Sequence, residues 1–157
     1  MIKVSRHSYI EGATPETIFA TLSDPKGLTQ LLPRVRQVDI LERKADWARL
    51  VTHMSLGGIF GTIRCEGELT WVEPSEIVFT VRKPLPVETR WTLTPTAAGT
   101  NLQAAIALDL APLLGPMAQF VPTDSVADMM AKELESALAS IKARSLVPKL
   151  QERSVAA

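Results

Sequence analysis

Three side chains in strand-like segments of this sequence could do acid–base chemistry: His53, Arg6 and Arg90. His53 could act as a general base or bind a ligand carbonyl, because the ordinary histidine pKa lies near neutral pH. The alternative is a half-exposed strand histidine. By period two, Arg6 shares a side with Val4 and Ile10, so a buried Arg6 would need an acidic partner or an anionic ligand. If the strand end frays instead, Arg6 reaches solvent. Catalysis would require at least one of these side chains, His53, Arg6 or Arg90, to point inward.

Other chemistries are limited by one cysteine and two histidines. Cys65 alternates with apolar residues and is expected to face inward, where burial makes a thiol unreactive. Cys-x-x-Cys and His-Glu-x-x-His motifs are absent from the sequence, so it predicts no zinc site. The glycines at 57, 58 and 61 precede a strand-like segment rather than a helix, which does not match a phosphate-binding loop. We therefore expect neither a metal nor a cofactor.

Composition favours one domain with a neutral surface. The chain has 157 residues, 46% of them hydrophobic, and 17 basic residues balance 17 acidic ones. A neutral chain has no overall electrostatic attraction for nucleic acid. The first residues lack the apolar run of a signal peptide, and no apolar stretch is long enough to span a membrane. We therefore expect a cytoplasmic protein without integral membrane association, and a homodimer remains open.

The elements that must position these side chains begin with a strand and two short helices. Imperfect alternation predicts a strand over residues 2–10. Thr14 is a suitable N-cap and Pro15 suits the first position of a helix. Residues 24–27 (DPKG) break that helix, and the leucines of residues 28–32 predict a second short helix.

From residue 35 to residue 110 the apolar period is two, with short turns at regular intervals. This pattern predicts six consecutive strands. Because parallel neighbours need long crossover connections, the six strands must form an antiparallel meander. One face of the alternation is apolar and the other polar, so one face is covered. The first strand is expected at or near an edge of the sheet.

The cover must come from the C-terminal part. Ser125 resembles the start of a capping box, and apolar residues then follow at spacings of three and four, up to Ile141. A helix of roughly 20 residues would be about 30 Å long, enough to cross a sheet. We expect one domain over residues 1–147 and a frayed tail over residues 148–157.

The order of these elements resembles the START/SRPBCC superfamily and its helix-grip fold. Four segments carry the resemblance: residues 13–19 (ATPETIF), residues 22–35 with their LSDP and LPRV ends, residues 91–95 (WTLTP) and residues 99–102 (GTNL). Residues 56–61 (LGGIFG) are similar to a turn in carbon-monoxide-dehydrogenase accessory proteins, and the chain also resembles bacterial polyketide-cyclase-like proteins. The resemblance implies an α+β fold: a curved seven-stranded antiparallel sheet wrapped around a long C-terminal helix, with two short helices between strands 1 and 2.

The helix-grip resemblance also implies a cavity between the sheet and the C-terminal helix. We expect its lining to include Ile63, Cys65, Leu69, Phe79, Trp91, Leu93, Ala104, Ile106, Met117, Phe120, Met130 and Leu134. For any single one of these residues, simple packing in the core is the alternative. Our leading hypothesis is a binding protein for a small hydrophobic or aromatic ligand, such as a lipid, a polyketide or a quinone-like molecule. The alternatives are a cyclase or dehydratase acting on such a ligand, and an accessory interaction module for a redox enzyme.

Overall fold

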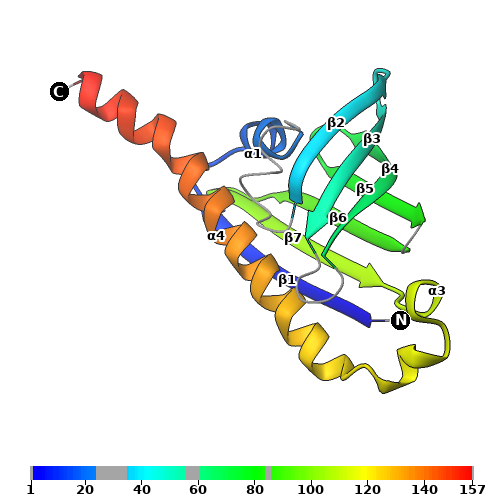
Figure 1. Ribbon diagram of the computed structural model, residues 1–157. Coiled ribbons are helices and arrows are strands. Elements are labelled where there is room, and N and C mark those ends of the chain that lie inside the picture. Colours follow the sequence, from blue (N-terminus) through cyan, green and yellow to red (C-terminus); the bar gives the residue numbers. More distant parts are fainter. Residues whose placement is uncertain (1, 24–34, 56–60, 84–85, 157) are drawn as a thin grey trace.

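The protein folds as a curved antiparallel sheet with one long helix across one face (Figure 1). The computed structural model describes residues 2–23, 35–55, 61–83 and 86–156. The strands are β1 (Ile2–Glu11), β2 (Val35–Arg43), β3 (Trp47–Ser55), β4 (Thr62–Val72), β5 (Glu76–Lys83), β6 (Val87–Pro95) and β7 (Gly99–Leu108). The described helices are α1 (Pro15–Leu22), α3 (Ala111–Leu114), the 3-10 helix η2 (Gly115–Phe120) and α4 (Thr123–Ala156).

The strand order β1-β7-β6-β5-β4-β3-β2 confirms the predicted meander, with β1 at one edge. All six neighbouring pairs are antiparallel. The α+β helix-grip architecture expected from the sequence is therefore confirmed. The second short helix, expected over residues 28–32, lies outside the described residues.

Helix α1 begins where the sequence predicts it. The Oγ1 of Thr14 accepts a hydrogen bond from the backbone N–H of Thr17 at 3.3 Å, and Pro15 occupies the first turn. This cap satisfies one of the N–H groups that a helix start leaves without a partner. The apolar side of α1 is buried, which ties the β1–α1 connection to the core.

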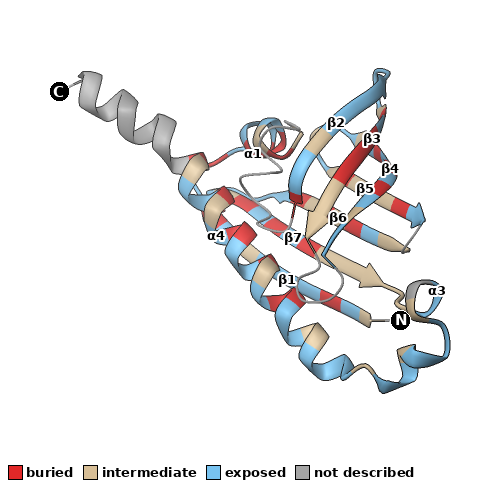
Figure 2. Ribbon diagram, in the orientation of Figure 1, coloured by how far each residue is buried: buried red, intermediate tan, exposed pale blue. Residues whose placement is uncertain are grey.

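Helix α4 packs mainly on β1 and β7, so it covers one side of the sheet rather than its whole width (Figure 1). Its inner stripe is buried and consists of Met130, Ala131, Leu134, Ala137, Leu138 and Ile141. These residues join one continuous core with the apolar face of the sheet. Figure 2 shows the same stripe of burial along the helix.

Two expectations about α4 need adjustment. The helix begins at Thr123, directly after Pro122, rather than at Ser125. It is also longer than the roughly 20 residues expected, because it continues to Ala156. The proposed division at residue 147 remains a prediction. Within the described ranges, none of the helices combines the length and apolar character needed to cross a membrane.

Candidate functional site

The concave face of the sheet is apolar across most of its width. Register pairing aligns side chains from five strands in one row across this face: Arg6, Ala104, Trp91, Ile77 and Trp71. The three central members, Ala104, Trp91 and Ile77, are at most 3% exposed. This part of the face belongs to the closed core of the domain.

Burial decreases toward the end of the sheet where β1 begins and β7 ends. Five apolar residues there are only partly buried, although they lie on the same concave face as the buried Val4 and Val81: Ile2, Phe79, Val87, Ile106 and Leu108. We call these five residues the apolar strip. Ile2, Phe79, Ile106 and Leu108 pack against the main core, and so does Val126 from the first turns of α4. The strip is therefore an apolar surface that the described part of the chain does not cover completely.

Phe79 packs against a glycine on the next strand. Its ring lies over Gly67, where an added Cβ would come within 2.9 Å of the ring and 2.8 Å of the Thr80 carbonyl oxygen. Such distances are shorter than normal van der Waals contact, so only glycine fits beneath the ring. The absence of a side chain at Gly67 thus leaves the space that the aromatic ring occupies.

Arg6 does not occupy the buried position that alternation predicted. Its side chain is 45% exposed, and its Nε lies 3.2 Å from the Glu135 Oε1 on α4. A second guanidinium nitrogen donates to the carbonyl of Ser5 at 2.7 Å. Because α4 covers only part of the edge strand, Arg6 reaches solvent and pairs with the helix. The ion pair links β1 to α4. The Arg6 charge is therefore neither buried nor in need of an anionic ligand.

His53 and Arg90 point away from the concave face. His53 alternates with the buried Thr52, and its Nε2 lies 3.8 Å from an oxygen of Asp39 on the outer side. Arg90 alternates with the buried Trp91 and forms ion pairs with Glu76 at 2.9 Å and Glu88 at 3.1 Å. The hydrogen bond to Glu88 is the main cause that raises the pKa of Arg90 above its ordinary value. Both side chains therefore lie on the outer face of the sheet.

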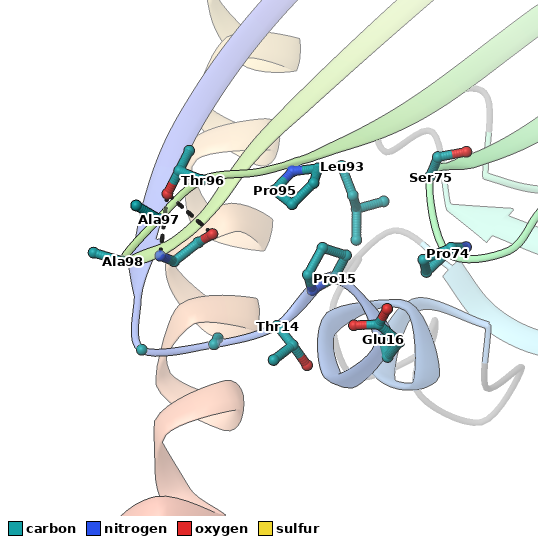
Figure 3. A pocket seen from close by; sticks show the side chains of 13 residues that line it. Thr14, Pro15, Glu16, Pro74, Ser75, Leu93, Pro95, Thr96, Ala97 and Ala98 are labelled. Carbon is teal, nitrogen blue, oxygen red and sulfur yellow. Dashed lines mark hydrogen bonds between the residues drawn. The ribbon is translucent and has the colours of Figure 1, made fainter.

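A pocket of about 590 Å³ lies at the other end of the sheet, where three loops meet (Figure 3). We call it the loop pocket. Its walls are Gly12, Ala13, Thr14, Pro15, Glu16, Pro74, Ser75, Leu93, Pro95, Thr96, Ala97, Ala98 and Gly99. Figure 3 shows Pro15 and Leu93 facing each other across it. Two of its hydroxyls are engaged within the chain, because Thr14 caps α1 and Thr96 bonds to the backbone of Gly99.

The comparison that decides the family covers nearly the whole domain. Residues 1–145 match the family described as polyketide cyclase / dehydrase and lipid transport. The chain belongs to this polyketide cyclase / dehydrase and lipid transport family. No curated protein sequence matches the chain.

Several solved structures have the same fold as this chain. The protein TTHA0849 from Thermus thermophilus is 20% identical, with a TM-score of 0.76 over 93% of this chain and 98% of its own. A START superfamily protein from Mycobacterium smegmatis is 20% identical, with a TM-score of 0.70 over 92% and 97% of the two chains. The Zhui aromatase/cyclase from a Streptomyces species is 15% identical, with a TM-score of 0.67 over 91% and 92%. At these identities the likeness concerns the fold alone.

In this family member, the residues expected to line a cavity fall into three groups. The buried ones are Cys65, Leu69, Trp91, Leu93, Ala104, Met130 and Leu134. The partly buried ones are Ile63, Phe79 and Ile106. Met117 and Phe120 are 67% and 75% exposed on η2, so the structure does not place them inside the domain. Contact of any of these residues with a ligand remains a prediction.

The loop pocket was missed at the sequence level, although each of its turns was recognised separately. In an antiparallel meander, the β4–β5 and β6–β7 turns lie at the same end of the sheet. The end of β1 lies there too, because β1 pairs antiparallel with β7 and Glu11 faces Gly99. Counting the alternating strand directions would therefore have predicted that these three loops lie at the same end of the sheet. Of the expected lining residues, only Leu93 is part of this pocket.

Cys65 is buried on the concave side, as its alternation predicted. Its side chain is 1% exposed, and the neighbouring Thr52 donates a hydrogen bond to its carbonyl oxygen at 3.5 Å. Removal from water disfavours the thiolate, so burial raises the pKa of the Cys65 thiol. The thiol is therefore protonated at neutral pH and shielded from reagents.

We expect the folded protein to react with a water-soluble disulfide reagent at least about 100-fold more slowly than the urea-unfolded chain at pH 8, because both the raised pKa and burial act against the thiolate. The measurement is the absorbance of the released aromatic thiol with time. A Val72→Cys variant in a Cys65→Ala background, with its thiol at a 63% exposed position, is the control and should react quickly when folded. Equal rates for Cys65 and Cys at position 72 would contradict the burial.

Proposed function

We propose that this protein binds a small hydrophobic or aromatic molecule, such as a lipid, a polyketide or a quinone-like compound, on the concave face of its sheet beside α4. The observation that carries the proposal is the apolar strip, whose side chains pack beside the buried core and remain partly exposed. An apolar ligand placed there would remove this surface from water, at about 25 cal/mol per Å² of apolar area. The family description, which includes lipid transport, supports the same class of ligand.

The strip has the composition of a binding surface. It combines an aromatic ring, that of Phe79 over Gly67, with aliphatic side chains from β1, β6 and β7. Apolar walls with few polar groups are typical of small-molecule sites. The ion pair between Arg6 and Glu135 lies at the edge of the same face, where a ligand with a polar end could meet it.

The test uses N-phenyl-1-naphthylamine, a neutral probe whose fluorescence rises in apolar surroundings. Ile106→Asn places a polar amide within the strip, and we expect the probe to bind about tenfold more weakly, because part of the apolar contact is lost. Fluorescence titration gives the Kd of the probe. Competition with a fatty acid, an aromatic polyketide and a short-chain quinone then ranks the ligand classes.

The matched control is Ala97→Trp, which fills the loop pocket at an exposed position and leaves the strip untouched. Wild type and Ala97→Trp should bind the probe equally. Thermal unfolding of each variant checks that Ile106→Asn is folded at the titration temperature. Loss of binding in Ala97→Trp with full binding in Ile106→Asn would move the site to the loop pocket and sink the proposal.

The cyclase or dehydratase alternative has the same cavity but needs acid–base groups that reach it. His53 and Arg90 lie on the opposite face, and Arg6 is paired with Glu135. Two buried hydroxyls of the core, those of Thr52 and Thr100, already donate to backbone carbonyls. These observations favour binding over catalysis. The accessory-module alternative has no specific contact in its support.

A further inference from the structure

The connection between the last strand and α4 projects from the end of the sheet without packing into it. It contains α3 and η2, which contact each other (Figure 1). None of the described side chains from 111 to 125 is buried, and Figure 2 shows the segment as exposed. Gly115, with φ of 57°, makes the turn between the two helices. This segment is therefore a protrusion with its own local structure.

The protrusion carries large apolar side chains on one side. Phe120 is 75% exposed and Met117 is 67% exposed, while Met129, two turns into α4, is 38% exposed. Residues three apart in a 3-10 helix lie on the same side, so Met117 and Phe120 point the same way from η2. Exposed apolar residues scattered singly need no explanation, but a pair on one side of a protruding turn does.

The charges around this side limit what can bind it. Residues 110–123 contain no charged side chain, and the nearest ones in sequence are the acids Asp109 and Asp124. The carboxylate of Asp109 accepts a hydrogen bond from the Ala111 N–H at 3.0 Å, which fixes it beside the segment. Such a surface suits an uncharged apolar medium and disfavours an anionic one.

Size separates a lipid surface from a protein partner. A stable protein interface buries about 800 Å² on each side and involves about 20 residues or more. The pair on η2 is much smaller than such an interface, whereas burial in the boundary region of a bilayer needs no matching partner surface and can be weak and reversible. We propose that η2 docks the protein reversibly on neutral lipid surfaces by inserting Met117 and Phe120. The evidence for this docking comes from η2 alone and is independent of the proposed ligand site.

The expected affinity is modest. A single myristoyl chain gives an association constant of only about 10⁴ M⁻¹, and two side chains bury less apolar area than that chain. We therefore expect half of the protein to be bound only well above about 0.1 mM lipid, which is the half-point for a single myristoyl chain. Vesicles of pure phosphatidylcholine and of phosphatidylcholine with about 30% phosphatidylserine test the charge argument, since the acidic flanks predict no gain from the anionic lipid.

The experiment is flotation of the full chain with these vesicles. The Met117→Ser/Phe120→Ser variant should lose at least about tenfold in bound fraction at low lipid, because both apolar contacts are removed. The control is Val72→Ser, an exposed apolar residue at the opposite end of the sheet, which should float like the wild type. Probe titration in the absence of vesicles reports the ligand site separately, so the two proposals fail independently.

Four results would overturn the docking. The wild type could remain in the bottom fraction with every vesicle composition. The double variant could float as well as the wild type. Flotation could require the anionic lipid, which would place the contact on basic residues elsewhere. Light scattering after size-exclusion chromatography gives the fourth: a dimer that the double variant dissociates would assign the pair to a second copy of the chain.

Discussion

Leu134→Ala is expected to lower the free energy of unfolding by about 3 kcal/mol, in the lower part of the range for buried leucines. Leu134 is fully buried on the inner stripe of α4 and belongs to the core that the helix shares with the sheet. Truncation removes its apolar contacts and leaves a cavity that a helix packed against an edge strand fills only in part. For a chain of this size, the midpoint of thermal unfolding should fall by about 10 °C.

Urea unfolding followed by circular dichroism measures this effect. The matched control is Leu41→Ala on β2, which is 47% exposed and should change the free energy of unfolding by less than about 0.5 kcal/mol. Equal losses for the two leucines would mean that α4 does not pack on the sheet as described. The slope with urea should be the same in both variants, because the surface exposed on unfolding is unchanged.

Gly99→Ala is expected to destabilise the protein by about 3 kcal/mol, the upper end of the range for inserting one carbon into a packed site. A Cβ at this position would collide with the carbonyl oxygen of Ile10 and come within 2.9 Å of the Glu11 Cα. Both obstacles are backbone atoms of β1, so no side-chain rotation relieves them. The collision would separate the first residues of β7 from the end of β1, where the two strands pair.

Hydrogen exchange of the β1 amides checks this mechanism. In Gly99→Ala the amides near Ile10 should exchange faster than those near Val4, because the disruption begins at the hairpin end. Ala98→Ser, an exposed neighbour in the same turn, is the control and should keep wild-type exchange and stability. An unaltered free energy of unfolding in Gly99→Ala would contradict the close approach of Gly99 to the backbone of β1.

The sheet could be predicted because alternation and turn residues are local signals. Period-two patterns from Val35 onward, interrupted by Gly and Pro turns, leave an antiparallel meander as the only short-loop solution. The start of α4 was placed two residues late because Ser125 resembles a cap, whereas the structure begins the helix at Thr123 after Pro122. Local cap signals give helix ends only to within one or two residues.

The candidate site was less predictable, because burial depends on what covers a residue. Alternation correctly put Arg6 on the side of Val4, but it cannot say that α4 leaves this part of β1 open and supplies Glu135. In the same way, Phe120 was expected in the cavity lining because it is apolar, while its exposure depends on whether its segment folds back onto the sheet. Cys65 was placed correctly because its strand lies inside the sheet, between β3 and β5, and its inward position is buried.

The pairing of the first strand with the last, under the final helix, has a consequence for synthesis on the ribosome. β2 to β6 form hairpins between neighbours in the chain, but β1 must wait for β7 and then for α4. At about 5–20 residues per second, that delay is on the order of ten seconds. During this delay the apolar concave face of the nascent sheet is exposed to solvent, because α4 has not yet been synthesised. A chaperone or an early-bound guest molecule would have its greatest influence on yield during that interval.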